Sequence, residues 1–312
     1  MHEQNFCGGE FVNKAKGFDG PTQLPRDNDE RRNWQNANRA WWQSTPMRYD
    51  WHEEIAADAG SKAYFEEIDR RFFSSAANYL PPRQRPFDAL IDFEGLESKD
   101  VLEIGVGQGS HAALIAARAK SFTGIDLTEA AAAMTRKRFE QFGIPGTIIQ
   151  MDAEEMSFAD GSFDLIWSWG VIHHSADTRR LLLEMHRVLR RGGTTTVMVY
   201  HHNWWNFGLI YGLIKGIAQG QLRKHRSLHR VVQAATDGAI GRYYSVHEWC
   251  ELAGDLFHVE SIRILGQKSD VIFLPAGLVK DGLQRALPDS AARLLTNNLR
   301  MGSFLVAHMR KI

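Results

Sequence analysis

The sequence predicts an α/β fold built around a mostly parallel sheet. Short apolar runs that are typical of buried strands alternate with longer segments that have helical composition or spacing. This alternation is most regular between residues 95 and 200, and it favours parallel strands joined by right-handed crossovers. A glycine-rich turn directly after the first of these strands is the second observation that favours this fold class.

The glycine-rich turn lies within residues 101–110, which read VLEIGVGQGS. We expect residues 101–104 to form a buried strand and residues 110–120 to form a helix. Between them, glycines occupy alternate positions, namely Gly105, Gly107 and Gly109. Because a Cβ atom there would block close approach or disfavour the required φ, the turn is expected to bring the backbone close to a bound cofactor.

The other elements follow along the chain. Further strands are expected at residues 122–126, 147–151, 163–168, 194–200, 259–265 and 303–308. Helices are expected at residues 61–80, 87–93, 128–142, 177–190, 203–220 and 245–252, with mostly helix over 278–299. Pro81 and Pro82 should end the first of these helices, and Gly192 and Gly193 should end the helix at 177–190.

We expect the chain to have four parts. Residues 1–94 should form an N-terminal arm and helical cap, residues 95–200 the core, residues 201–245 a helical insertion, and residues 246–312 the C-terminal part of the core. Residues 1–30 are expected to be irregular. The aromatic residues that follow should pack as an arm on the core or close over a substrate pocket: Trp34, Trp41, Trp42, Tyr49 and Trp51.

Composition limits the cellular compartment and the kinds of partner that are expected. Lys plus Arg and Asp plus Glu both number 37, so net charge gives no reason to expect a nucleic-acid partner. Cys7 and Cys250 are far apart and form neither a disulfide framework nor a metal cluster, which favours a reducing, cytoplasmic setting. Residues 1–21 lack the apolar segment of a secretory signal, and no run has the length of a membrane span.

Polar and aromatic residues follow the predicted strands where a ligand would be expected. Glu103 precedes the glycine turn, Asp126 ends the second strand, and Asp152 follows the third. Residues 169–174, which read WGVIHH, follow the fourth strand. Open α/β sheets bind ligands at the carboxyl ends of their strands, so these residues are expected to line one site.

Two classes of nucleotide-like cofactor compete for this site. A nicotinamide oxidoreductase also needs an acidic residue such as Asp126 to hold ribose hydroxyls. Glu103, however, would repel a pyrophosphate, whereas it could pair with the ammonium group of an amino acid. The turn also reads G-V-G-Q-G and not G-x-G-x-x-G. These features favour S-adenosylmethionine, a cationic nucleoside that carries an amino acid and no phosphate.

Successive segments of the chain resemble the motifs of class I S-adenosylmethionine-dependent methyltransferases, in the order EIGVGQG, GIDLT, MDAEEMSFADGSFDLIWSWGVIHH and EMHRVLRRGG. The resemblance covers about residues 95–200 and is greatest to the type 11 group, which includes quinone, sterol and sugar methyltransferases. It implies a Rossmann-like seven-stranded sheet of order 3-2-1-4-5-7-6, with helices on both faces and an antiparallel final strand.

The resemblance also implies a role for each site residue. Asp126 would bind the ribose hydroxyls while Leu127 packs on the adenine. Asp152 would accept a hydrogen bond from the adenine amino group, helped by the backbone N–H of Ala153, and Trp169 would line the sulfonium side. The methionine end would be surrounded by Glu103, Gly105, Gly107 and Gly109.

For the reaction, we expect O-methylation of a hydroxyl on a small-molecule acceptor. The segments MRYDWH, RKRFEQFGIPG and VMVYHHNWWN resemble uncharacterised bacterial members of the group, which favours a secondary-metabolite or polysaccharide pathway. C-methylation of a quinone or isoprenoid-like substrate is the alternative within the class. A nicotinamide oxidoreductase and a non-catalytic S-adenosylmethionine-binding subunit are the alternatives outside it.

A histidine is the expected general base, because imidazole accepts protons near neutral pH. His173 and His174 are the candidates, and His173 is favoured because the loop first leaves the sheet there; alternatively, both only pack or cap the turn. Tyr49 and Tyr200 are expected to contact substrate. No metal is expected, since the adjacent histidines at 173–174 and 201–202 cannot easily ligate one ion.

The insertion after the fifth strand is unusually apolar. Residues 203–220 are apolar nearly all round, with a glycine every four residues from Gly208 to Gly220. A basic run follows over residues 223–230. We expect a helix that packs on the core or on a second copy of the chain in a homodimer. Peripheral membrane contact through residues 203–230 is the alternative, because cations beside an apolar helix favour anionic head groups.

Overall fold

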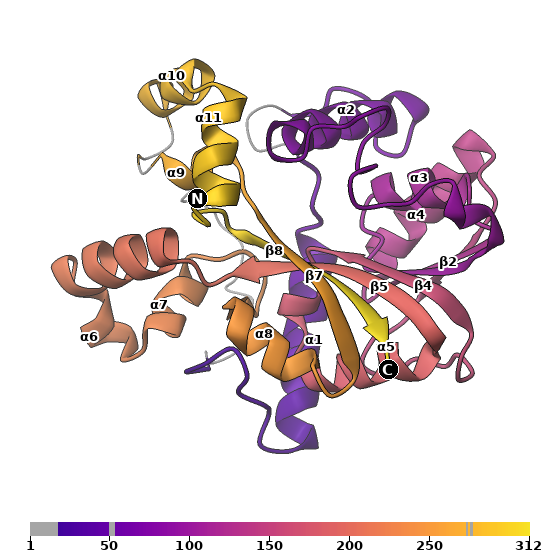
Figure 1. The fold of residues 1–312 in the computed structure, drawn as a ribbon, viewed down its shortest axis with the longest axis horizontal. Helices are drawn as coiled ribbons and strands as arrows, with labels where there is room; N and C mark the ends of the chain where they lie inside the picture. The colour runs from indigo at the N-terminus through magenta and orange to yellow at the C-terminus, as the bar shows by residue number, and fades with distance from the viewer. Residues whose placement is uncertain (1–17, 50–53, 273, 275–276) are drawn as a thin grey trace.

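The structure is a computed structural model, and it describes residues 18–49, 54–272, 274 and 277–312 (Figure 1). A single sheet lies at its centre. Its strands are β1 (Asp100–Ile104), β2 (Ser121–Asp126), β3 (Thr147–Gln150), β4 (Phe163–Trp169), β5 (Leu189–His201), β6 (Tyr243–Tyr244), β7 (Phe257–Leu265) and β8 (Phe304–Lys311).

The strand order is β3-β2-β1-β4-β5-β8-β7, and the two-residue strand β6 pairs with β5. Only β8 runs antiparallel to its neighbours β5 and β7 within the described sheet. The order predicted for seven strands is confirmed, with β7 and β8 as its sixth and seventh members. The short strand β6 was not predicted, because two residues carry no measurable alternation.

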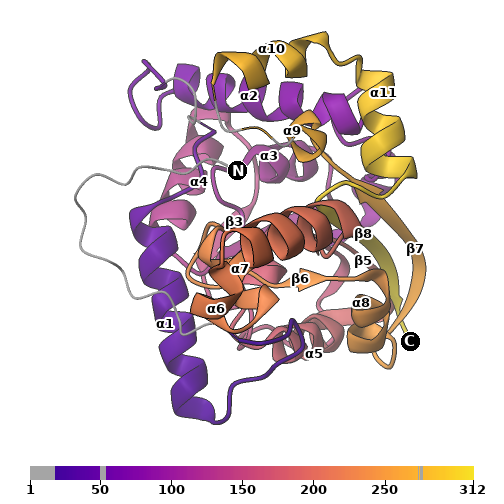
Figure 2. The same cartoon turned by 90° about the vertical axis from the view of Figure 1, so that its left-hand side faces the viewer.

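Helices surround the sheet (Figure 2). The α-helices are α1 (Asn28–Ser44), α2 (Lys62–Tyr79), α3 (Ser110–Ala116), α4 (Glu129–Phe142), α5 (Thr178–Val188), α6 (Gln221–His225), α7 (Leu228–Ala234), α8 (Val246–Ala253), α9 (Lys268–Val271), α10 (Leu278–Ala286) and α11 (Asp289–Arg293). The 3₁₀-helices are η1 (Gly95–Ser98) and η2 (Ile172–His174), and the π-helices are η3 (Trp204–Ala218) and η4 (Leu294–Asn298).

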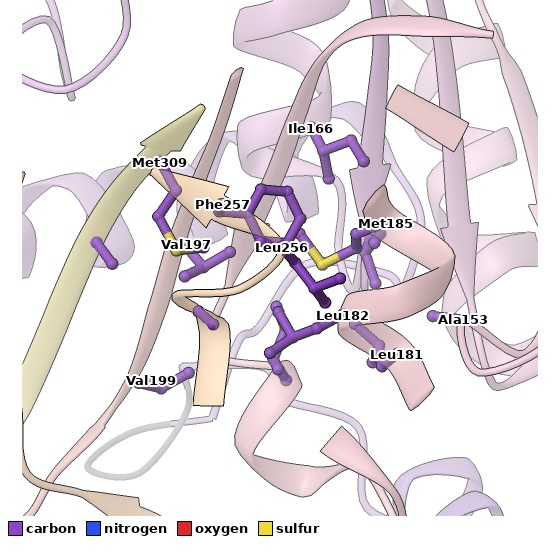
Figure 3. Close-up of a cluster of buried hydrophobic side chains, with 14 of the residues drawn as sticks. Ala153, Ile166, Leu181, Leu182, Met185, Val197, Val199, Leu256, Phe257 and Met309 are labelled. Carbon is purple, nitrogen blue, oxygen red and sulfur yellow. The ribbon is translucent and has the colours of Figure 1, made fainter. Parts of the chain in front are cut away.

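The apolar core lies on both faces of the sheet, as the pattern of a parallel sheet requires. Alternate residues of β1 point to opposite faces, so that Leu102 and Ile104 join one cluster and Val101 joins the other. On the first face, Leu182 and Met185 of α5 pack against the sheet near Phe257 of β7 (Figure 3). This packing holds α5, which follows β4 in the chain, against the sheet.

Two predicted elements are corrected by the structure. Residues 87–93 form turns and not a helix; Phe87 has a φ of 63°, which a right-handed helix excludes, and its buried ring stacks on Phe72 at 5.5 Å. Helix α5 ends at Val188, before the glycines, because Leu189 is already extended and pairs with Phe163. Gly192 and Gly193 lie within β5.

Residues 28–44, predicted only as part of an irregular and aromatic arm, form the helix α1. Asp27 caps it by accepting a hydrogen bond from the backbone N–H of Glu30 at 2.8 Å. Trp51 of the predicted aromatic cluster lies outside the described residues. The predicted helix at 203–220 is the π-helix η3, which buries Phe207 and Tyr211 against α7. None of the helices in the described residues is long and apolar enough to cross a bilayer.

Candidate active site

A cavity of about 2500 Å³ lies at the carboxyl ends of the central strands. Its floor is the glycine turn after β1 together with the ends of β2, β4 and β5. Helices α1, α2, η3 and α10 contribute the walls. The sheet therefore brings residues from both halves of the chain to one chamber, which is large enough for a nucleoside cofactor and an acceptor together.

The glycine turn leaves room on its cavity side. Gly107 has a φ of 53°, and a Cβ atom placed on it would meet no atom within 4 Å, so this backbone faces open space. Gly105 also lines the cavity, but a Cβ there would lie 2.2 Å from Cγ2 of Val171. Gly109 does not line the cavity; it begins α3 and packs against Thr135 of α4. The turn thus offers bare backbone to a ligand at Gly107, whereas the missing Cβ of Gly105 leaves room for Val171.

Glu103 is a buried carboxylate without a full set of partners. It is 3% exposed, and its Oε2 atom has no hydrogen-bond partner among the described residues. Burial, and then the charge of Asp126, raise the pKa of Glu103 well above its usual range, while Arg138 acts in the opposite direction. An orphaned carboxylate beside the glycine turn fits a ligand that brings a cationic donor, and the ammonium group of S-adenosylmethionine is such a donor.

Asp126 is held in a fixed orientation at the end of β2. One carboxylate oxygen accepts hydrogen bonds from the backbone N–H and the hydroxyl of Thr128, both at 2.9 Å, and the other accepts from Gly107 N–H at 3.2 Å. Burial raises the pKa of Asp126, and these hydrogen bonds partly offset the increase. Leu127 lies next to it in the cavity wall. This arrangement suits recognition of ribose hydroxyls.

Asp152 lines the cavity after β3, beside Ala153. Its Oδ1 accepts hydrogen bonds from Glu154 N–H at 2.9 Å and from the side-chain amide of Gln35 at 2.8 Å. Gln35 is a buried residue of α1, so α1 closes the adenine side of the predicted cofactor site. The sequence did not indicate Gln35, because it lies more than 100 residues before Asp152.

Trp169 lines the cavity at the end of β4 and stacks on Trp167, with ring centroids 5.7 Å apart and planes 6° apart. His111 of α3 lies beside it and was also missed from the sequence; its ring is 4.4 Å from that of Phe87. Burial lowers the pKa of His111 to about 3, so this ring is a neutral wall and not a charged group.

The two candidate histidines occupy different places. His173 is completely buried and does not line the cavity; its ring lies 3.7 Å from that of Tyr200, and neither ring nitrogen has a hydrogen-bond partner among the described residues. His174 does line the cavity. The expectation that His173 borders the pocket is therefore corrected, because the 3₁₀ turn η2 directs His173 behind Tyr200.

Comparisons with known proteins agree with this geometry. Residues 102–197 match the family model described as a methyltransferase domain. A probable S-adenosylmethionine-dependent methyltransferase of Mycobacterium tuberculosis is 36% identical over 93 residues, which span 30% of this chain and 32% of that relative. Residues 102–197 form a class I S-adenosylmethionine-dependent methyltransferase domain of the type 11 group, and its cofactor is S-adenosylmethionine.

Two further similarities extend beyond the domain. A ubiquinone biosynthesis O-methyltransferase of Pseudomonas aeruginosa is 28% identical over 137 residues, spanning 43% of this chain and 59% of that relative. A chain in the complex between the Haloferax volcanii Trm112 methyltransferase activator and a putative methyltransferase is 16% identical, with a TM-score of 0.52. That alignment covers 81% of this chain and 95% of the other, and it shows the fold alone. The chain spans about a third of the length of the first curated relatives that it matches.

In the methyltransferase domain, the ring of His174 is held by a hydrogen bond at Nδ1. Its Nδ1 lies 2.5 Å from the backbone carbonyl oxygen of Ile240, which only accepts, so Nδ1 carries the proton. Nε2 makes no hydrogen bond within the described residues, so its lone pair is available to a donor in the cavity. Burial lowers the pKa of His174, although Asp237 and the hydrogen bond to Ile240 act against this, so the ring is neutral at pH 7.

A network of buried contacts holds the histidine loop in place. The side-chain amide of Asn38 donates to the carbonyl of His174, and Arg242 donates to the carbonyl of Ala176 at 2.7 Å. Glu154 accepts from Ser175 Oγ at 2.8 Å and pairs with Arg31 of α1 at 3.2 Å. These partners come from α1, from the loop after β3 and from the segment before β6, so no local sequence pattern could reveal them.

Tyrosines also line the cavity. Tyr49 and Tyr200 both line the cavity, as predicted contacts with substrate require, and burial raises the pKa of each. The hydroxyl of Tyr200 donates to Oδ1 of Asp237 at 2.9 Å, and Asp237 also lines the cavity. Within the described residues, no group of three His, Cys, Asp or Glu side chains could hold a metal ion.

Proposed function

We propose that this protein transfers the methyl group of S-adenosylmethionine to a hydroxyl oxygen of a small-molecule acceptor, with His174 as general base. The position of His174 carries the proposal: it is a neutral histidine with a free Nε2 in the same cavity as the glycine turn. The O-methyltransferase among the relatives supports oxygen as the acceptor atom. The general base is thus moved from His173 to His174.

In this proposal, the chain supplies binding, orientation and a proton acceptor. Glu103 would bind the ammonium group of the cofactor, Asp126 the ribose, and Asp152 the adenine amino group. When bound, S-adenosylmethionine supplies a sulfonium methyl group, which the acceptor oxygen takes up as the carbon–sulfur bond breaks. His174 takes the hydroxyl proton at Nε2, and Ile240 stabilises the resulting imidazolium through Nδ1–H.

The walls of the acceptor side favour a lipophilic acceptor over a free sugar. Tyr49, Tyr200, Phe207 and Tyr211 all line the cavity. Aromatic walls of this kind stabilise rings and hydrocarbon groups of a ligand. Of the two expected kinds of pathway, we therefore propose a secondary-metabolite pathway. The acceptor would be a hydroxyl compound that bears a ring or an isoprenoid-like group.

Methyl transfer from tritiated S-adenosylmethionine to a panel of alkylated catechols tests this proposal. His174→Asn keeps a donor to the Ile240 carbonyl and removes Nε2, so turnover should fall by about 10²–10⁴-fold, the usual size of general-base catalysis. Binding of S-adenosylhomocysteine, measured by calorimetry, should be unchanged. A loss of less than about tenfold would remove His174 from this role.

The same measurements separate the other classes. A nicotinamide oxidoreductase would bind NAD and not S-adenosylhomocysteine. A non-catalytic subunit would bind S-adenosylhomocysteine but methylate no acceptor in the panel until a partner protein is added. Either result would contradict the proposed function.

A further inference from the structure

Exposed apolar side chains are concentrated in two segments of the chain. Twelve large hydrophobic residues are exposed in the described part of the chain, and nine of them lie within 204–217 and 274–299. These nine are Trp204, Leu213, Ile217, Leu274, Leu278, Val279, Leu283, Leu294 and Leu299. Clustered exposure of this kind marks an interaction surface, whereas single exposed residues elsewhere are ordinary.

The π-helix η3 exposes an apolar stripe along one side. Trp204, Leu213 and Ile217 are 57%, 52% and 66% exposed, and Gly208 lies between them in the same stripe. These positions are separated by four or five residues, which is one turn of a helix with i to i+5 hydrogen bonds. Phe207 and Tyr211 are buried and line the cavity. The helix is therefore a cavity wall on one side and an apolar surface on the other.

Helix α10 has its apolar side turned outward. Leu278, Val279 and Leu283 are 87%, 72% and 47% exposed. The polar residues of the same helix line the cavity instead: Lys280, Asp281, Gln284 and Arg285. An amphipathic helix on a water-soluble surface has the opposite orientation, so the outer side of α10 needs an apolar environment.

Both helices lie on the same side of the molecule. Figure 1 shows η3, the coral helix above α6 and α7, projecting on the side that also carries α9, α10 and α11. Figure 2, viewed from that side, shows η3 in front and α10 across the top. Since both helices line the cavity, their outer surfaces flank the same chamber.

The charges beside η3 indicate which kind of partner fits. Residues 203–236 contain no Asp or Glu, but they include Lys215, Arg223, Lys224, Arg226 and Arg230. Arg223, Lys224 and Arg226 are exposed and make no ion pair with other described residues, whereas Arg230 pairs with Asp19 at 3.0 Å. A second copy related by a twofold axis would oppose these cations with cations. An anionic lipid surface complements both the charges and the apolar stripe.

We propose that η3 and α10 bind this face of the protein to an anionic lipid bilayer, so that a lipophilic acceptor passes between them into the cavity. The inference rests on the proposed function for the identity of the acceptor, but the binding surface stands on its own observations. Trp204, Leu213 and Ile217 enter the boundary between head groups and acyl chains, and the cations of α6 and the following turn contact lipid phosphates. Bilayer binding then supplies an acceptor that is too apolar to diffuse through water.

Sedimentation with vesicles tests the bilayer surface. The full chain should sediment with phosphatidylcholine vesicles that contain 30% phosphatidylglycerol at 50 mM NaCl, and much less with pure phosphatidylcholine or at 500 mM NaCl. The double variant Leu213→Gln/Ile217→Gln should bind at least about tenfold more weakly, because two apolar side chains no longer enter the bilayer. A matched control, Leu24→Gln/Leu183→Gln, removes two exposed leucines outside the two segments and should bind like the wild type.

Several outcomes would overturn the inference. The inference is wrong if the folded wild-type protein does not bind anionic vesicles at low salt. It is also wrong if the control variant loses as much binding as the η3 variant. A dimer in solution that the η3 variant dissociates, without vesicle binding by either, would assign the stripe to a second copy. S-adenosylhomocysteine binding is measured on the same samples, so a failure of the bilayer surface with cofactor binding intact is distinct from a failure of the proposed function.

Discussion

Replacement of Glu103 by Gln should separate two effects of the buried carboxylate. One is its unfavourable effect on the free energy of unfolding, and the other is its contribution to cofactor binding. In the ligand-free protein, Oε2 has no partner among the described residues, and the pKa of Glu103 is raised well above its usual 4.5 by burial first. The folded state therefore binds this proton more tightly than the unfolded chain does. Stability should fall as pH rises above the unfolded value, by up to about 1.4 kcal/mol per pH unit, until pH exceeds the folded pKa.

Glu103→Gln removes that pH-dependent loss, so its free energy of unfolding at pH 7 should exceed that of the wild type. Its affinity for S-adenosylmethionine should fall by about 1.5–3 kcal/mol, or about 10- to 150-fold, because a hydrogen bond to the cofactor ammonium loses its charge. Denaturant unfolding between pH 5 and 8 and titration calorimetry measure the two effects. Glu97→Gln, at an exposed glutamate, is the control.

The opposite signs of the two effects make the test specific. A variant that binds the cofactor as tightly as the wild type would show that Glu103 does not contact the ammonium group. A variant that is less stable than the wild type across this pH range would show that the carboxylate has a partner in the folded protein. Either result would refute the assignment of Glu103 to the cofactor.

Three further changes address the rest of the site. Asp126→Ala should weaken S-adenosylmethionine binding by about 1.5–3 kcal/mol. Calorimetry that shows unchanged affinity would contradict the assignment of Asp126 to the cofactor ribose. Gly107→Val should abolish cofactor binding in a folded protein, because the new side chain enters the open space beside the turn and the φ of 53° disfavours it. Lys280→Met should raise the free energy of unfolding by about 1–3 kcal/mol, since Lys280 is 8% exposed and has no hydrogen bond or ion pair among the described residues. Lys224→Met, at an exposed lysine, should leave stability unchanged, and a destabilised Lys280→Met would contradict this prediction.

The sheet could be predicted because its signals are local. The strand at Val101–Ile104, the glycine turn and the acidic residues at or just after the ends of the next two strands all lie within short segments. The topology of the sheet then brings them to one edge. The helix prediction at Phe87 was wrong because this residue has a positive φ and its ring packs on Phe72 of the preceding helix α2. The pattern of apolar residues alone does not show that constraint.

The choice between His173 and His174 could not be made from sequence. Neighbouring residues of a short 3₁₀ turn point in different directions, and which one reaches the cavity depends on partners far along the chain. Those partners are Tyr200, which covers His173, and Ile240, which orients His174. Gln35 of α1 was missed for the same reason, since its contact with Asp152 joins residues 117 positions apart.

The pH dependence of methyl transfer tests the central claim most directly. With an acceptor from the catechol panel, wild-type kcat/KM should fall at low pH through a pKa below 6.5, because burial favours the neutral form of His174. His174→Asn should lose this acid limb together with most of its activity, whereas His173→Asn should keep the limb. An acid limb that survives in His174→Asn and disappears in His173→Asn would contradict the account.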